Sequence, residues 1–228
     1  MTNIFLDFDD TIIDTRLNAH TALAELYEHF DLGSRFSSFD AFAEPYWRRN
    51  HEVWAAYSRG EMTKEELIIE RFRYPLSLVG LGTPEFAFEL SDYFLDACAR
   101  KGELVEGARE LLDYLRRRGY RLHMISNGFS EVQHRKMQSA GVEDYFDCVI
   151  LSEAVGVNKP DPAIFAYALR EAGCAAADAV MIGDNFDTDI RGAMAAGIPQ
   201  IYFNPEGKPV PQKPTWEVRS LAEIEQIL

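Results

Sequence analysis

Short apolar runs that end in polar residues recur along the chain. The first, residues 2–8, reads TNIFLDF. Such runs are typical of strands that are buried on both faces of a parallel sheet and carry polar residues at its carboxyl edge. We therefore predict five strands, which cover residues 2–8, 121–127, 148–151, 179–184 and 200–204.

Amphipathic segments with helix start and stop signals lie between these runs. Segment 130–140 opens with Ser130 and Gln133 at the spacing of a capping box, and Gly141 follows its end. The alternation of strand and helix predicts an α/β fold with a doubly wound parallel sheet. The predicted helices of this part cover residues 106–118, 130–140, 161–172, 187–196 and 220–228.

Residues 15–101 interrupt the alternation, because they show helical patterns only. We predict that residues 1–14 and 102–228 form an α/β core domain and that residues 15–101 form a helical domain inserted after the first strand. The helices of this insertion are expected at residues 17–30, 38–57, 63–72 and 83–100.

The net charge of −14 over 228 residues argues against a partner that is a nucleic-acid polymer or an anionic membrane, since either requires a basic surface. No apolar run approaches the ~20 residues that span a bilayer, and the first residues lack the pattern of a signal peptide. The three cysteines show neither disulfide nor metal-site spacing. We therefore expect a cytoplasmic protein, monomeric or homodimeric, whose partner is a small molecule.

Polar residues follow several of the predicted strands, and ligands of open α/β sheets bind beyond the carboxyl ends of the strands. Carboxylates brought together there repel one another, and a cation relieves that repulsion. All-oxygen ligation suits Mg²⁺, and no His or Cys cluster indicates zinc. The residues expected at this edge are Asp7, Asp9, Thr11, Ser126, Asn127, Lys159, Asp184 and Asp189.

The same residues stand in four sequence motifs. DFDDT at residues 7–11 resembles motif I of the haloacid dehalogenase superfamily, and ISN at residues 125–127 resembles motif II. NKPDPAIF, which contains Lys159, resembles motif III, and GDNFDTDI at residues 183–190 resembles motif IV. The motifs occur in the order of the family, and the helical insertion is similar to its small all-α cap domain, which covers the active site.

The resemblance implies a role for each motif residue. Asp7 would attack phosphorus and form an aspartyl-phosphate, and Asp9 would protonate the leaving oxygen and later take a proton from water. Mg²⁺ would be held by Asp7, the Asp9 carbonyl and Asp184, with Asp189 in support. The phosphoryl group would be bound by Thr11, Ser126, Asn127 and Lys159.

The acid at position 9 favours phosphatase chemistry over dehalogenation, because displacement of a halide needs no proton donor. The chain most resembles the branch of pyrimidine 5′-nucleotidases, which implies a nucleoside 5′-monophosphate as the small phosphorylated substrate. A sugar-phosphate or acyl-sugar phosphatase is the alternative; a phosphomutase and a non-catalytic binding protein of this fold are less favoured.

Two further features allow more than one interpretation. In the helical insertion, Trp47, Arg48 and Asn50 are either packing residues or contacts to a base or sugar. His123 lies within a predicted strand and is interpreted as a core histidine.

Overall fold

The computed structural model describes residues 2–228, which include a six-stranded sheet. The strand order is β3-β2-β1-β4-β5-β6, and every neighbouring pair is parallel, which confirms the predicted doubly wound α/β fold. The strands are β1 (Asn3–Leu6), β2 (Arg121–Ser126), β3 (Cys148–Leu151), β4 (Ala179–Gly183), β5 (Gln200–Phe203) and β6 (Trp216–Val218).

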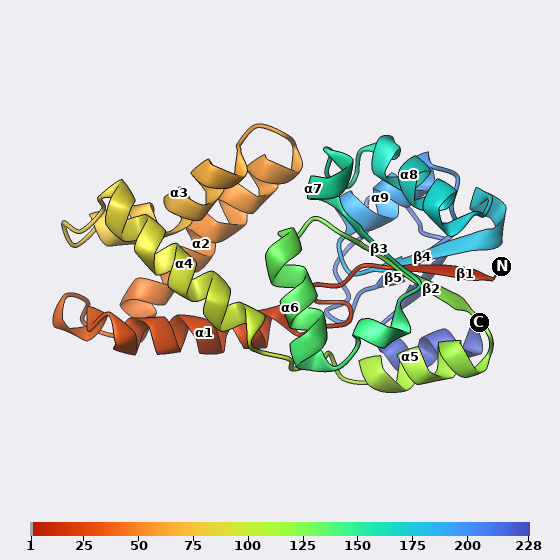
Figure 1. The fold of residues 1–228 in the computed structure, drawn as a ribbon, viewed down its shortest axis with the longest axis horizontal. Helices are drawn as coiled ribbons and strands as arrows, with labels where there is room; N and C mark the ends of the chain where they lie inside the picture. Colours follow the sequence, from red (N-terminus) through yellow and green to blue (C-terminus); the bar gives the residue numbers. More distant parts are fainter. Residues whose placement is uncertain (1) are drawn as a thin grey trace. The chain divides into compact units, whose positions relative to one another are not determined.

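Helices cover both faces of the sheet (Figure 1). Alternate residues of β1 belong to different cores, because successive side chains of a strand point to opposite faces. Ile4 and Leu6 pack with α5 (Ala108–Arg117) and α6 (Ser130–Ala140), whereas Phe5 packs with α8 (Pro162–Ala172) and α9 (Arg191–Ala195). A strand buried on both faces accounts for the continuous apolar run at residues 4–6.

The sheet and its helices differ from the sequence prediction at several places. The helix expected at residues 220–228 is a 3-10 helix, Leu221–Gln226, and the short helix α7 (Ser152–Val155) was not predicted. β6 was not predicted, since it is a three-residue edge strand with a single buried side chain, Val218. The single helix expected at residues 187–196 is a π-helical turn, Phe186–Ile190, followed by α9. The Asn185 side chain accepts hydrogen bonds from the backbone N–H groups of Asp187 and Thr188 and so fixes the start of that turn.

The capping box expected at Ser130 and Gln133 is wrong. Phe129 is the N-cap residue, so Ser130 is already the first residue of α6, and its backbone N–H donates to Glu153 Oε2 at 2.6 Å. The Glu153 carboxylate therefore accepts the hydrogen bond that the Gln133 side chain was expected to accept from the Ser130 N–H. The Gln133 side chain is available for other contacts.

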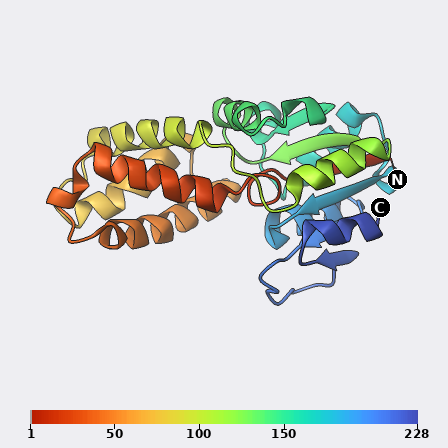
Figure 2. The same ribbon diagram turned by 90° about the horizontal axis from the view of Figure 1, so that it is seen from below.

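The inserted segment forms a compact helical unit, Arg16–Lys101, and the remainder forms the α/β unit, Met1–Thr15 with Gly102–Leu228. Four helices make up the helical unit (Figure 2). Their apolar side chains share one core. None of the helices among residues 2–228 is long and apolar enough to cross a membrane. The four helices are α1 (Thr15–His29), α2 (Phe39–Ser58), α3 (Lys64–Ser77) and α4 (Pro84–Ala99).

The two chain segments that connect the units are paired with each other. The Asp14 backbone N–H donates to the Glu103 carbonyl at 2.9 Å, and the Val105 N–H donates to the Ile12 carbonyl at 3.0 Å. An antiparallel bridge between Ile13 and Leu104 lies between these bonds. The chain therefore leaves and re-enters the α/β unit through two adjacent, hydrogen-bonded segments.

Gly102 makes a close backbone approach beside this pair. A Cβ atom there would lie 2.3 Å from the Ser139 carbonyl oxygen and 2.7 Å from the Ala140 nitrogen, both of α6. Backbone atoms cannot yield as a flexible side chain does, so Gly102→Ala is expected to lower the free energy of unfolding by about 2 kcal/mol. Urea unfolding measures this, with Gly33→Ala, where the nearest atom is 3.5 Å away, as the control. Equal stability of the two variants would contradict the close approach.

Candidate active site

Three neighbouring strands bring polar side chains to one edge of the sheet. Asp7 follows β1, Ser126 ends β2 and Asp184 follows β4. Because β2, β1 and β4 are adjacent and parallel, their carboxyl ends meet at the same edge. Lys159 reaches this edge from the loop between α7 (Ser152–Val155) and α8.

Lys159 is buried between two carboxylates. Its Nζ lies 2.6 Å from Asp7 Oδ1 and 2.7 Å from Asp189 Oδ1, and it donates to the Ile125 carbonyl at 2.8 Å. Burial acts to lower the pKa of Lys159, but attraction to the two aspartates outweighs it and raises that pKa above its ordinary value. The ammonium is therefore a fixed positive charge directly beside Asp7.

The Asp7 carboxyl is buried and crowded by other acids. Burial is the largest influence on its pKa and raises it well above the ordinary value; Lys159 opposes the shift, and Asp189, Asp184 and Asp9 add to it. One lysine thus does not fully balance the negative charge at this edge. A carboxylate in such surroundings is ionised more readily when a further cation is present.

Asp7, Asp184 and Asp189 have the arrangement of a metal site. Each offers a carboxylate oxygen, and these oxygens all lie within 4.8 Å of one another. The Thr11 hydroxyl donates to Asp184 Oδ1 at 3.2 Å, which orients that carboxylate. An all-oxygen donor set of this kind fits a hard divalent cation such as Mg²⁺.

Magnesium is expected to stabilise the protein more at about pH 8 than at about pH 5. Burial, followed by the charges of Asp189 and Asp10, raises the pKa of Asp184 from 3.8 to about 7. A raised carboxyl pKa favours the folded protein below pH 3.8, and this contribution is lost as the pH rises through about 7. At the higher pH a bound cation offsets the charge that the lost proton leaves on Asp184. Thermal unfolding with Mg²⁺ and with a chelator, at both pH values, measures the stabilisation by the metal.

In Asp184→Asn the metal-dependent rise in unfolding temperature should depend less on pH. An equal rise at both pH values in the unmodified protein would count against this assignment of Asp184.

Asp9 has different partners from Asp7. Lys136 Nζ lies 2.6 Å from Asp9 Oδ1, Thr15 donates to the same oxygen at 2.6 Å, and Gln133 Nε2 donates to Oδ2 at 2.5 Å. Burial acts to raise the pKa of Asp9, but the charge of Lys136 and the three donated hydrogen bonds outweigh it and lower the pKa. Asp9 is therefore an ionised carboxylate with both oxygens held.

The two polar residues of motif II have distinct contacts. Ser126 Oγ is buried and accepts hydrogen bonds from the Gly128 N–H at 3.0 Å and from Gln133 Nε2 at 2.7 Å. The Asn127 side chain instead pairs with the backbone of Lys159, accepting from its N–H at 2.7 Å and donating to its carbonyl at 2.9 Å. Asn127 thus fixes the loop that carries Lys159.

Gln133 and Lys136 were missed by the sequence analysis as site residues. Both are polar residues at buried positions of α6, next to the apolar Val132 and Met137. Polar side chains on the buried face of a helix require partners, and this was the signal available in the sequence. For Gln133 this signal was overlooked, because its spacing from Ser130 also fits a capping box.

The candidate contacts of the helical insertion lie on α2. Trp47 packs edge-on against the buried Tyr46 ring, at 5.0 Å between ring centroids. Arg48 is exposed and donates to the Tyr74 hydroxyl at 2.8 Å. Asn50 Oδ1 is buried and has no hydrogen-bond partner among residues 2–228. Trp47, Arg48 and Asn50 are thus in different surroundings within the helical unit, and their contact with substrate stays a prediction.

His123 is a core residue, as the sequence analysis predicted. It is fully buried on β2, and its Nε2 lies 3.1 Å from Asn3 Oδ1. Burial lowers the pKa of His123 to about 4, so the imidazole is neutral at physiological pH.

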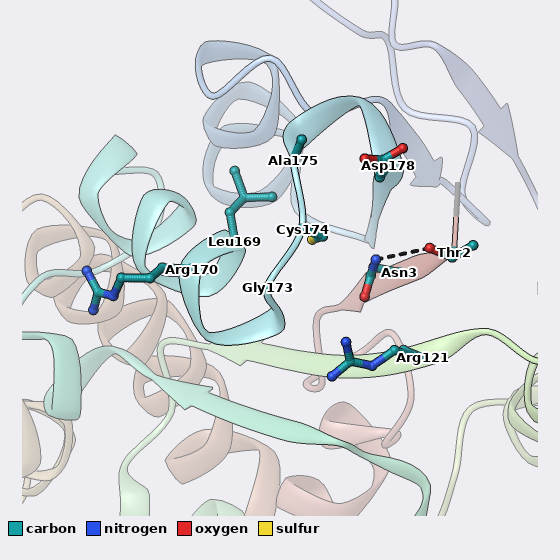
Figure 3. Close-up of a pocket in the computed structure, with 9 residues that line it drawn as sticks. All are labelled: Thr2, Asn3, Arg121, Leu169, Arg170, Gly173, Cys174, Ala175 and Asp178. Carbon is teal, nitrogen blue, oxygen red and sulfur yellow. Dashed lines mark hydrogen bonds between the residues drawn. The ribbon is translucent and has the colours of Figure 1, made fainter.

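An open hollow of about 590 Å³ lies at the opposite end of the sheet from the carboxylates. Figure 3 shows the residues that line it. It is lined at the starts of β1 and β2 by Asn3 and Arg121 and at the end of α8 by Arg170 and Gly173. Arg121 donates to the Ala172 carbonyl at 2.9 Å. With a single acid, Asp178, in its lining, the hollow lacks the chemistry found at the carboxyl edge.

Comparison with known proteins points to one family. The model of the haloacid dehalogenase-like hydrolases matches residues 1–197. The pyrimidine 5′-nucleotidase YjjG of Escherichia coli is 32% identical over 99% of this chain and 96% of its own. A phosphoserine phosphatase of Thermus thermophilus is also 32% identical, over 90% of this chain and 89% of its own.

Among solved structures, the putative hydrolase YfnB of Bacillus subtilis superimposes with a TM-score of 0.88 at 28% identity. The match covers 99% of this chain and 97% of that protein, whose structure was determined bound to magnesium and reveals interdomain movement.

Proposed function

The chain belongs to the haloacid dehalogenase-like hydrolase family, and we propose that it is a magnesium-dependent phosphatase that works through an aspartyl-phosphate on Asp7. The observation that carries the proposal is the buried Asp7 carboxylate in contact with Lys159. A second acid, Asp9, stands two residues further along the chain in a separate set of hydrogen bonds. Asp7, beside the fixed positive charge of Lys159, suits the role of nucleophile. Asp9, held by hydrogen-bond donors, suits the role of acid–base group.

In the first step an Asp7 oxygen attacks phosphorus, and the bond from phosphorus to the leaving oxygen breaks. The leaving oxygen takes a proton from Asp9 and departs as an alcohol. In the second step Asp9 accepts a proton from water while that water attacks the aspartyl-phosphate. Inorganic phosphate leaves, and Asp7 is regenerated with its carboxylate intact.

Asp9 must gain a proton before the first step, because its pKa is lowered in the free protein. The negative charge of a bound phosphomonoester favours that proton uptake, since a nearby like charge raises the pKa of a carboxyl group. The ionised form that the free protein maintains is the form needed as a base in the second step.

The remaining residues supply charge and orientation. Lys159 offsets the negative charge gathered around Asp7 and the phosphoryl group, and Ser126 lies at the edge where the phosphoryl oxygens would bind. Asp7 and Asp184 would hold Mg²⁺ with Asp189. When bound, the ion supplies positive charge to the transferring group.

We propose a pyrimidine nucleoside 5′-monophosphate as the substrate. Support comes from YjjG, a pyrimidine 5′-nucleotidase that matches nearly the whole chain. The second candidate is a small phosphomonoester without a base, because the phosphoserine phosphatase is equally similar in identity.

The test is phosphate release with Mg²⁺ from uridine, thymidine and adenosine monophosphates, phosphoserine and sugar phosphates. Uridine and adenosine monophosphates form a matched pair that differs only in the base. Preferential turnover of the pyrimidine supports the nucleotidase, and turnover of phosphoserine or sugar phosphates alone supports the second candidate. No release from any ester by a folded, magnesium-loaded protein would refute the phosphatase proposal.

A further inference from the structure

We infer that Gln133 is a positioning residue for the acid–base group Asp9, which it ties to Ser126 at the end of β2. This inference rests on the proposed phosphatase function. It assigns a role to a residue of α6, outside the four sequence motifs.

The Gln133 amide bridges the two groups directly. Its Nε2 donates to Asp9 Oδ2 at 2.5 Å and to Ser126 Oγ at 2.7 Å. An amide nitrogen carries two hydrogens, so both bonds can form at once. Asp9 and Ser126 come from the loop after β1 and the end of β2, and one planar group therefore fixes the separation of two loops.

The bridge is maintained at an energetic cost. Gln133 is 1% exposed, and its Oε1 is buried without a hydrogen-bond partner among residues 2–228. A buried carbonyl oxygen without a hydrogen bond is unfavourable, and an apolar residue at this position would avoid that cost. Rotation of the amide by half a turn would direct Oε1 at the Asp9 carboxylate and replace attraction with repulsion. The orientation of the amide that lets Nε2 bind Asp9 is therefore the one that leaves Oε1 buried without a partner.

Space for the bridge depends on Gly128. A Cβ atom at this glycine would lie 2.3 Å from Gln133 Nε2 and 2.5 Å from its Cδ. Gly128 shows no left-handed backbone angle, so the absence of a side chain serves the Gln133 amide rather than a turn. The loop after β2 and the buried face of α6 thus fit each other around this one side chain.

The other Asp9 oxygen has its own donors, Thr15 Oγ1 and Lys136 Nζ, each at 2.6 Å. With Gln133 on Oδ2, rotation of the carboxylate is restrained from both sides. Proton transfer requires the acid oxygen to lie within hydrogen-bond reach of the leaving oxygen, and small displacements of such a group are costly. Loss of Gln133 should therefore impair the step that needs the proton.

The experiment compares Gln133→Met with the unmodified enzyme on two esters. The leaving group of p-nitrophenyl phosphate is a stable anion, so its departure needs little protonation. The leaving group of an alkyl phosphate is a poor one unless it is protonated, so the alkyl ester that is turned over best in the substrate panel depends on the acid. kcat/KM is the quantity compared, because it reports the steps up to departure of the leaving group. We expect kcat/KM to fall at least about tenfold more for the alkyl ester than for the aryl ester, part of the 10²–10⁴-fold that acid–base catalysis contributes.

Controls separate positioning from damage to the fold. Gln138→Met changes the same residue type at an exposed position of α6 and should leave the ratio of the two kcat/KM values unchanged. In an Asp9→Asn background Gln133→Met should not change that ratio further, because the group it positions is gone. If the methionine variant does not fold, Gly128→Ala gives the same test, since its methyl group would displace the amide.

An equal loss for both esters in Gln133→Met would overturn the inference while leaving the phosphatase proposal intact. An unmodified enzyme that is inert toward both esters would instead refute the proposed function.

Discussion

Replacement of Asp7 by asparagine is expected to reduce phosphate release at least about a thousandfold while the protein remains folded, because the side chain that attacks phosphorus is lost. Asparagine has nearly the same shape as aspartate, and it removes one negative charge from the group that contains Asp184 and Asp189. The free energy of unfolding without metal should therefore be unchanged or higher. Steady-state phosphate release and urea unfolding measure the two effects.

The same variant tests the covalent intermediate. Rapid quenching of the unmodified enzyme with substrate should yield protein with the mass of one added phosphoryl group, and Asp7→Asn should yield none. Phosphate release by Asp7→Asn at the original rate would exclude Asp7 as the nucleophile.

Replacement of Lys159 by methionine is expected to reduce kcat at least about a hundredfold and the free energy of unfolding by about 3 kcal/mol without metal. The Lys159 side chain is 3% exposed, and its Nζ lies 2.6 Å from Asp7 and 2.7 Å from Asp189. Its removal leaves two buried carboxylates without their cation. Magnesium should restore part of the stability and little of the activity, because the ion cannot occupy the position of the lysine Nζ.

Lys101→Met is the matched control for this variant. Lys101 also contacts a carboxylate at 2.6 Å, that of Glu25, but Glu25 is 44% exposed. Exposed ion pairs contribute at most about 1 kcal/mol, so this control should unfold nearly as the unmodified protein does. Comparable stability of the Lys159 and Lys101 variants would contradict the burial argument.

The sequence predicted the sheet well because the strands at its centre are buried on both faces. Runs such as residues 4–6 are apolar without interruption, and the polar residues that follow them mark the carboxyl edge. β6 escaped prediction, since an edge strand with one buried side chain leaves almost no hydrophobic pattern.

The sequence indicates which polar residues the sheet topology brings together, but it does not indicate contacts between distant segments. Asp7 and Asp184 follow strands directly, so the topology brings them together. Gln133 contacts Asp9 across a sequence separation of 124 residues, and its spacing from Ser130 matched a capping box as well. The spacing alone does not distinguish these two uses of a glutamine, and only the place of Gln133 on the buried face of α6 indicates a partner in the interior.

The paired segments around Ile13 and Leu104 mark a place where the inserted helices could be exchanged for another segment. The segments before and after the inserted helices are hydrogen-bonded to each other within the α/β unit. The two ends of the insertion are therefore held close together by the α/β unit itself. A foreign segment with similarly spaced termini can be grafted there without lengthening either connection. This junction is therefore a suitable site for building chimaeras in which the α/β unit carries a different insertion.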